Sequence, residues 1–296
     1  MSHKCTKETS LTVIIPMLCR SGVHSTLIDW ITEFKAIGCV CVQVIIVLDL
    51  NKCAESEAQD CRKKLGSALD KLLNCLILES DFGAPGLSRN AALAFVKGRH
   101  LMFWDADDFP HISTIANLLP LKEKVIHIFG FSKVQIKNQE SVVEKIPASL
   151  SKFCRTPGIW RIAFPRTSVV GLDFPAIRMG EDLVFIAKVL LIGNFEEIDM
   201  RAEITYDYYR GVAGQLTSDK SAIEDQTKAI QEIISLLKEY KDSRRLEKII
   251  VIKIVVWQIA SSIKRNLIIG LVRSLTPMFT IFSIWFNNLI RGSFKN

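Results

Sequence analysis

Short β-branched runs alternate with helix-like segments over the first hundred residues of the chain, and this alternation most constrains the fold. Residues with strand character lie at 11–16, 42–48, 73–78 and 100–104. Apolar residues at helical spacing lie between them, at 24–37, 54–73 and 86–96. The resulting β-α-β-α-β-α-β order predicts an α/β fold with a mostly parallel sheet and helices on both faces, which is typical of nucleotide-binding proteins.

The predicted strands end in residues suited to ligand binding. The first strand ends at Pro16, the second runs into Asp49, the third is followed by Glu79 and Asp81, and the fourth runs into Asp105, Asp107 and Asp108. In open α/β sheets, ligands bind in the crevice at the carboxyl ends of the strands. Three successive strands therefore deliver carboxylates to one predicted binding edge.

The segment Phe103-Trp104-Asp105-Ala106-Asp107-Asp108 is the sharpest local signal, because an apolar strand ends there in three crowded carboxylates. Like charges at this spacing raise one another's pKa, whereas Mg²⁺ or Mn²⁺ takes oxygen ligands and bridges carboxylates to phosphates. The alternative is a solvated turn with helix-capping aspartates, which is the more common origin of a bare D-x-D pattern. The motifs elsewhere in the chain favour the metal site.

Six segments, in sequence order, resemble motifs of the GT-A glycosyltransferases that are usually called family 2. These segments are Thr12-Val13-Ile14-Ile15-Pro16, Val47-Leu48-Asp49-Leu50-Asn51, Gly86-Leu87-Ser88-Arg89-Asn90-Ala91-Ala92, Trp104-Asp105-Ala106-Asp107-Asp108, Gly180-Glu181-Asp182-Leu183-Val184-Phe185, and Tyr208-Tyr209-Arg210 with Gln215-Leu216-Thr217-Ser218. The resemblance covers residues 11–218 and implies a GT-A (Rossmann-like) catalytic domain over residues 1–218. It implies an inverting, metal-dependent hexosyltransferase of bacterial surface-glycan type, with a nucleotide-sugar donor, expected to be a UDP-sugar. The implied acceptor is a glycan or lipid-linked saccharide in surface polysaccharide biosynthesis.

The same resemblance assigns the donor side of the site residue by residue. Pro16 would belong to the donor pocket, Asp49 would contact the ribose or base, Asp81 would contact the base edge, and Arg89 would hold this region together. Arg210 suits the donor pyrophosphate because a guanidinium fork fits phosphate oxygens, although a surface ion pair is an equal alternative.

The acidic cluster would hold the cation. By resemblance, Asp105 would lie near the ribose and the metal, and Asp107 would ligate the Mg²⁺ or Mn²⁺ that bridges the two donor phosphates. A metal on the departing nucleoside diphosphate stabilises the transition state more than the ground state, because negative charge grows there during transfer.

A second acidic pair would supply the base. The acceptor hydroxyl must lose its proton as it attacks the anomeric carbon, and a positioned carboxylate can accept it. Asp182 occupies the base position of the resembled family, with Glu181 as its neighbour, and a single in-line displacement would invert the anomeric configuration. The alternative is an acidic pair at a helix N-terminus, which the helix dipole favours. Trp160 could stack on an acceptor sugar, although an aromatic residue is more often part of the core.

The donor motifs depart from the family pattern at two places. The family often has a second Asp and then Gly-Ser around the position of Asp49, whereas this chain has Leu48, Leu50 and Asn51. After Pro16 it has Met17-Leu18-Cys19-Arg20 in place of an aromatic-Asn pair. An atypical donor pocket is therefore expected.

Net charge and cysteine content limit the classes of partner and the cellular compartment that are expected. The net charge of +7 fits phosphates or an anionic membrane, and no nucleic-acid-binding motif accompanies it, so no nucleic acid partner is expected. The eight cysteines include no C-x-x-C pair, and the polar N-terminus lacks a signal-peptide core, so reduced, structural, cytoplasmic thiols are expected.

The C-terminal region, residues 219–296, is predicted to be helical and membrane-associating. Charged residues interrupt its apolar stretch at 249–290, which fits helices lying in the membrane interface rather than a clean span. Its Trp and Phe side chains would dip inward: Trp257, Phe279, Phe282, Trp285 and Phe286. This predicts a peripheral protein on the cytoplasmic face of the membrane. The alternative is a buried helical subdomain or a dimer contact, so a homo-oligomer stays open.

Two other classes of protein compete with the enzyme hypothesis. A non-catalytic, membrane-associated module of the same fold would bind nucleotides or act as a scaffold without turnover. A nucleotidyltransferase on a related sheet ranks last, because no Gly-rich loop with Lys or Arg follows the first strand.

Overall fold

The structure, a computed structural model, describes residues 9–19, 25–38, 41–70, 74–137, 140–210, 222–240 and 243–265. Nine strands of these residues form one sheet: β1 (Leu11–Leu18), β2 (Val42–Asp49), β3 (Cys75–Ser80), β4 (His100–Phe103), β5 (Phe109–Pro110), β6 (Val125–Lys137), β7 (Glu140–Ile146), β8 (Ile162–Pro165) and β9 (Glu197–Arg210). The helices are α1 (Ser25–Ile37), α2 (Glu55–Leu69), α3 (Pro85–Leu93), α4 (Ile112–Leu118), α5 (Leu150–Arg155), α6 (Glu181–Ile192), α7 (Ala222–Glu239) and α8 (Arg245–Arg265).

The strand order is β3-β2-β1-β4-β8-β6-β9-β5, with β7 paired to β6 outside this path. The strands β1 to β4 are parallel to one another, and the predicted β-α-β-α-β-α-β order is confirmed. The helix predicted at 54–73 ends at Leu69, and β3 begins only at Cys75. Helix α2 buries Ala58, Cys61, Leu65 and Leu69 at helical spacing, so its apolar face ends at that residue.

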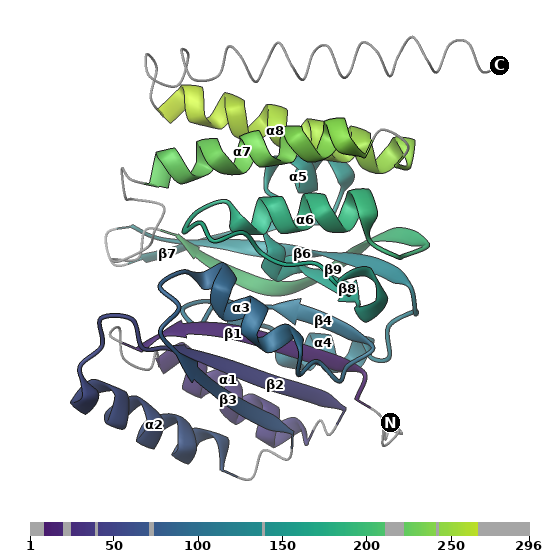
Figure 1. Ribbon diagram of the computed structural model, residues 1–296. Helices are drawn as coiled ribbons and strands as arrows, with labels where there is room; N and C mark the ends of the chain where they lie inside the picture. The colour runs from purple at the N-terminus through teal and green to yellow at the C-terminus, as the bar shows by residue number, and fades with distance from the viewer. Residues whose placement is uncertain are drawn as a thin grey trace, which may run out of the picture.

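Helices cover both faces of the sheet, as predicted (Figure 1). On one face, α1, α2 and α4 pack against alternate side chains of β1 and β2 around Trp30 and Trp104, whose ring centroids are 5.7 Å apart. On the other face lie α3 and α6. Successive strand residues point to opposite faces, so β2, which is fully buried, and β1, which is buried over most of its length, supply both cores.

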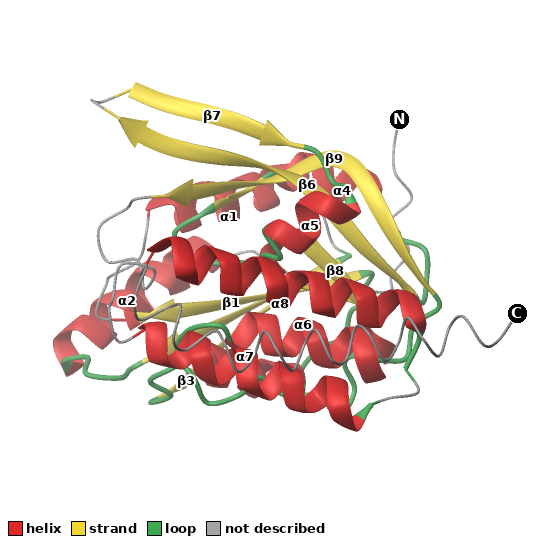
Figure 2. Ribbon diagram, turned by 90° about the horizontal axis from the view of Figure 1, so that it is seen from above, coloured by secondary structure: helices red, strands yellow, loops and turns green. Residues whose placement is uncertain are grey.

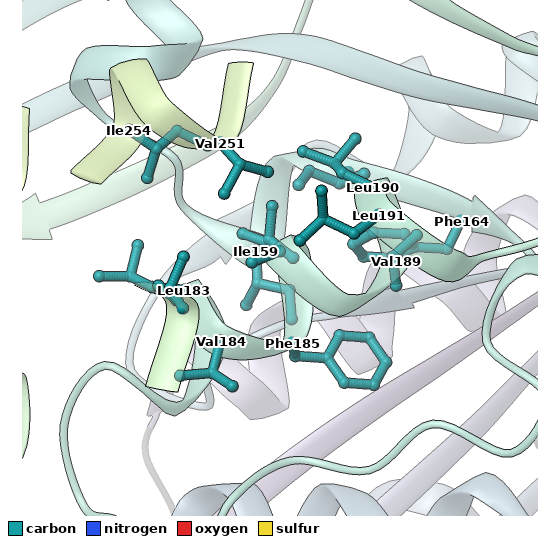
Figure 3. Packing of buried hydrophobic residues seen from close by; sticks show 14 of the residues in the cluster. Ile159, Phe164, Leu183, Val184, Phe185, Val189, Leu190, Leu191, Val251 and Ile254 are labelled. Carbon is teal, nitrogen blue, oxygen red and sulfur yellow. The ribbon is translucent and has the colours of Figure 1, made fainter. Parts of the chain in front are cut away.

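Helix α6 lies between the sheet and a further layer that contains α7 and α8 (Figure 1). Val251 and Ile254 of α8 belong to the same apolar cluster as Leu190 of α6 (Figure 3). The α6 residues Leu183 to Leu191 are apolar on nearly every side, as expected for a helix buried between two layers. Phe185 stacks on Phe174 with ring centroids 3.9 Å apart and contacts Phe103 of β4 edge-on. Full burial of one such side chain contributes roughly 1.5–3 kcal/mol, so this packing holds α6 firmly against the sheet.

The second half of the sheet contains antiparallel pairs. Strand β8 is antiparallel to both β4 and β6, whereas β6 and β9 run parallel. Strands β6 and β7 form a hairpin that extends beyond the helices at one edge of the molecule (Figure 2).

The C-terminal helices join the main core. Buried residues of α7 and α8 belong to the same apolar cluster as α6 and the sheet. Along the parts of the chain that the structure describes, no helix is both long and apolar enough to cross a membrane. Trp257 on α8 is 39% exposed. The guanidinium carbon of Arg155 lies over its ring, 4.4 Å from the ring centroid. Phe279, Phe282, Trp285 and Phe286 lie outside the described residues.

Candidate active site

Asp49 joins the carboxyl ends of β2 and β3. Its Oδ1 accepts hydrogen bonds from the backbone N–H groups of Asn51 at 3.0 Å and Phe82 at 3.1 Å, and its Oδ2 accepts one from Gly83 at 3.0 Å. The residue is 5% exposed. Its carboxylate therefore fixes the turn after β2 and the loop after β3. Pro16 lies in β1, beside Val47 of β2.

Asn51 links this turn to Asp81. The Asn51 side chain donates from Nδ2 to Oδ1 of Asp81 over 2.6 Å. A side chain at Gly83, where φ is +68°, would bring its Cβ within 3.3 Å of the same amide nitrogen. Asn51 therefore orients the predicted base-contacting carboxylate. Sequence reasoning recorded Asn51 only as a departure from the family pattern.

Arg89 of α3 connects the two acidic motifs. Its Nη2 donates to Oδ1 of Asp105 at 3.0 Å, and its Nη1 donates to Oε1 of Glu181 at 2.8 Å. The Arg89 side chain is buried, and burial of one guanidinium with two carboxylates satisfies charges that would otherwise be unstable in the interior. This bridge brings the start of α6 to the end of β4.

Two glycines permit this close approach. A Cβ on Gly86, near the start of α3, would lie 2.9 Å from Cβ of Phe174 and 3.1 Å from Cγ of Glu181. Gly180, which precedes α6, has a φ of +86°, and a Cβ there would meet Ala229 at 2.8 Å. Larger residues at either position would push α3 or α7 away from α6.

Residues of β9 hold the acidic cluster in place through hydrogen bonds. The hydroxyl of Tyr206 accepts the backbone N–H of Asp105 at 3.0 Å and hydrogen bonds to the carboxylate of Asp108. Oδ1 of Asp108 also accepts the N–H of Tyr209 at 2.9 Å. Asp108 is 2% exposed, so it anchors the loop, whereas the Asp105 side chain is 34% exposed. Sequence reasoning missed Tyr206, because β9 lies about a hundred residues further along the chain.

Burial raises the pKa of three carboxyl groups at this site, those of Asp105, Glu181 and Asp182. Burial raises the pKa of Asp105 to about 6, against the opposing effect of Arg89, and Asp107 and Asp182 add to the increase. Burial raises the pKa of Glu181 to about 7, and it also raises the pKa of Asp182. Each of these carboxyl groups would release its proton more readily if a positive charge were bound nearby.

The cluster suits a cation that takes most of its ligands from a substrate. Among the described residues, no group of three or more His, Cys, Asp or Glu side chains is arranged to hold a metal. Mg²⁺ typically binds one or two carboxylates together with substrate phosphates and water. Asp105 and Asp107 can supply that number, and the like charges around them favour a cation.

Trp160 and Arg210 lie beside this centre. Trp160 is 6% exposed and stacks on Tyr206 and Tyr208, with ring centroids 4.8 and 5.4 Å away. This packing favours a structural role for its ring. Arg210 is the last residue of β9, and its side chain lies outside the described residues. Asp182 begins α6 next to Glu181, and its Oδ1 accepts the N–H of Leu183 at 2.8 Å.

The architecture is the fold of the GT-A glycosyltransferases. It is similar to S. aureus TarS 1–349 in complex with UDP-GlcNAc, with a TM-score of 0.68 over 93% of this chain and 81% of that one, at 16% identity. It is also similar to the mannosyltransferase PcManGT from Pyrobaculum calidifontis in complex with GDP-Man and Mn²⁺, with a TM-score of 0.52 over 95% and 87% of the two chains, again at 16% identity. Such identities establish the fold alone.

A sequence relative adds to this picture. The chain is 27% identical over 176 residues to WfaP of Escherichia coli, a UDP-Glc:alpha-D-GlcNAc-diphosphoundecaprenol beta-1,3-glucosyltransferase, with 57% of this chain and 67% of WfaP covered. No family model matches the chain. Together, the fold, the site and this relative support glycosyltransferase activity with a nucleotide-sugar donor.

Proposed function

We propose that this protein is a metal-dependent, inverting glycosyltransferase that moves a sugar from a UDP-sugar to a saccharide acceptor. The observation that carries the proposal is the Arg89 bridge, because it joins the D-x-D segment at Asp105 to the Glu-Asp segment at Glu181. A site for phosphate charge and a site for proton removal thereby lie together at the carboxyl ends of the strands, where α/β sheets bind their ligands.

The donor would lie over the ends of β1 to β4. Asp81, held by Asn51, would accept a hydrogen bond from the base, and Asp49 would keep the surrounding backbone in place beside Pro16. Arg210 would reach the pyrophosphate. A UDP-sugar is proposed because WfaP uses UDP-Glc and TarS was determined with UDP-GlcNAc.

Asp107 and Asp105 would hold Mg²⁺ or Mn²⁺ against the donor phosphates. A bound divalent ion would supply charge stabilisation for the departing nucleoside diphosphate. Arg89 would keep Asp105 in place through its Oδ1 atom, and Tyr206 and Asp108 would fix the loop that carries both ligands.

Asp182 would act as the general base. Its raised pKa, caused by burial, makes it a better proton acceptor than an exposed aspartate. The acceptor hydroxyl would pass its proton to Asp182 as its oxygen bonds to the anomeric carbon, while the bond from that carbon to the diphosphate oxygen breaks. Glu181 would position α6 rather than take the proton, because Arg89 already engages its carboxylate.

The acceptor is proposed to be a saccharide linked to a lipid, in surface polysaccharide biosynthesis, because WfaP acts on GlcNAc-diphosphoundecaprenol. A peripheral position on the cytoplasmic face of the membrane would bring the site to such an acceptor. On α8, the exposed side chains of Leu246, Val256 and Trp257 support membrane contact by this helix. Trp160 would shape the acceptor side through its stack with the two tyrosines.

The test is a donor screen followed by a titration. The full chain is mixed with UDP-Glc or UDP-GlcNAc, Mn²⁺ and a diphosphate-lipid-linked GlcNAc, and products are followed by mass spectrometry. Transfer that requires the metal, and that Asp107→Asn abolishes, supports the proposal. The matched control is Asp60→Asn, because the Asp60 side chain lies on the exposed face of α2, where it pairs with Lys64. Calorimetric binding of UDP with Mn²⁺ but no turnover with any donor would favour the non-catalytic alternative.

A further inference from the structure

Two cysteine sulfurs meet at the edge of the proposed donor pocket. Sγ of Cys53 donates to Sγ of Cys19 over 2.8 Å, and Sγ of a third cysteine, Cys61, donates to the backbone oxygen of Cys19 at 3.4 Å. Cys19 is fully buried, whereas Cys53 is partly exposed. The described residues offer no group of His, Cys, Asp or Glu ligands around these thiols that could hold a metal. The short distance between the sulfurs of Cys53 and Cys19 favours thiol chemistry at this pair.

The pair lies where both donor motifs depart from the family pattern. Cys19 directly follows β1, and Cys53 ends the turn that follows β2. The N–H of Cys53 donates to the oxygen of Leu50 at 3.0 Å, and Lys52 adopts a left-handed φ of 56°. The same turn carries Asn51, which orients Asp81. A covalent change at Cys53 would therefore act on the residue that positions the base-contacting carboxylate.

We propose that Cys19 and Cys53 form an oxidisable pair whose disulfide ties β1 to the donor turn and weakens nucleotide binding. Its effect on the nucleotide rests on the proposed function, whereas formation of the bond does not.

The oxidant is a small-molecule disulfide such as glutathione disulfide. The exposed thiol reacts first: the Cys53 thiolate attacks one sulfur of glutathione disulfide, forms a mixed disulfide and releases one glutathione thiolate. The Cys19 thiolate then attacks Sγ of Cys53 and expels the second glutathione. Both protein thiols lose their protons to solvent, and one glutathione disulfide is reduced to two glutathiones.

The second step should be slow near neutral pH. Burial, together with the neighbouring thiols of Cys53 and Cys61, raises the pKa of Cys19 far above its usual range. The mixed disulfide on Cys53 should therefore accumulate first and close faster as the pH rises, because only the thiolate of Cys19 attacks.

Closure should weaken binding of UDP. The two sulfurs are 2.8 Å apart and must come to the bonding distance of about 2.05 Å. The short turn passes that movement to Asn51, two residues away. Loss of the Asn51–Asp81 hydrogen bond should weaken UDP binding by roughly tenfold, the usual contribution of one hydrogen bond to a charged group.

The experiment treats the reduced full chain with glutathione disulfide and maps the products by mass spectrometry of unreduced digests. The expected product is a Cys19–Cys53 cross-link lighter by two hydrogens, which forms faster at higher pH and is absent from Cys53→Ser. The control variant Cys75→Ser, on the edge strand β3, should form it normally. Glutathione adducts on Cys53 that never close, even at alkaline pH, would overturn the proposal.

Calorimetry with UDP and Mn²⁺ tests the consequence. Oxidised wild-type protein should bind UDP more weakly than reduced protein, and reducing agent should restore the affinity, whereas oxidant should leave the affinity of Cys53→Ser near its untreated value. A complete cross-link with unchanged UDP affinity would refute the coupling. If the reduced wild-type protein binds no UDP, the proposed donor fails, and the mapped cross-link still decides whether the thiol pair exists.

Discussion

The two ends of the parallel strands treat buried polar groups in opposite ways. At the amino ends, Thr12 of β1 donates to Oε1 of Gln43 at 2.7 Å and accepts the N–H of Gly98 at 2.8 Å. The Gln43 side chain also bonds to the oxygen of Phe95 and the N–H of Lys97. Every partner in this network is neutral and satisfied, so the network stabilises the fold.

The carboxyl ends instead gather like charges. Asp105, Glu181 and Asp182 surround one guanidinium, and burial raises the pKa of all three carboxyl groups. Their ionised forms therefore reduce the free energy of unfolding when no cation is bound. The comparison teaches that the amino ends serve stability, whereas the carboxyl ends carry an arrangement whose value lies in binding and catalysis.

The largest expected effect on activity comes from Asp182→Asn, which tests whether the carboxyl end serves catalysis rather than stability. Loss of the proposed base should lower kcat by roughly 10²–10⁴-fold, measured as sugar transfer at saturating donor. The amide keeps the shape of the side chain and removes a negative charge beside Asp105 and Glu181, so the melting temperature should stay the same or rise. Undiminished transfer would remove Asp182 as the base.

Removal of the Arg89 guanidinium should destabilise the carboxyl end of the sheet. Arg89→Met leaves the buried Glu181 and the partly exposed Asp105 without a positive partner, and the free energy of unfolding should fall by about 3–5 kcal/mol. Denaturant titration measures this loss, and Arg89→Lys should recover part of it, because an ammonium keeps the charge but not the fork. A Met variant as stable as wild type would show that the bridge contributes no net stability.

The sequence predicted the polar ends of the strands but not how they are held. Alternation of β-branched and helical segments was sufficient to place Asp49, Asp81 and Asp105 at one edge, because parallel strands share their direction. The contact of Asp105 with Tyr206 and the contact of Arg89 with Glu181 join residues 101 and 92 positions apart, and no local pattern encodes them. The amino-end network of Thr12 and Gln43 was missed for the same reason.

The C-terminal helices show another limit. Apolar content alone does not distinguish a helix in a membrane interface from one in a core, and α7 and α8 bury one side of each helix against α6 and α5. The exposed residues of α8, such as Val256 and Trp257, distinguish its outward-facing surface from the surface that packs in the core.

The two ends should also respond to pH in opposite directions. At the amino end, burial and His127 lower the pKa of His100 from 6.5 to about 4, so the unfolded chain binds more protons between these values. Stability should therefore fall as the pH drops from 6.5 towards 4, by up to about 3 kcal/mol. Denaturant titrations across this range should show a flatter profile for His100→Gln, whose amide can still donate to the oxygen of Val125.

At the carboxyl end, the folded protein binds the extra proton. The pKa of Glu181 rises from 4.5 to about 7 through burial, so its contribution to stability is present below pH 4.5 and is lost as the pH rises towards 7. Glu181→Gln should remove this loss, on the order of 3 kcal/mol. The same titrations measure it, and an unchanged pH profile in the variant would contradict the assignment.

The smallest expected effect tests whether the amino end serves stability alone. Thr12→Val keeps the shape of the side chain but leaves the buried N–H of Gly98 without its acceptor, so the free energy of unfolding should fall by about 1–3 kcal/mol. UDP affinity in Mn²⁺ should stay at the wild-type value, because the network lies at the opposite end of β1 from Asp105. A variant that unfolds more easily and also binds UDP more weakly would show that the two ends are coupled through the strand.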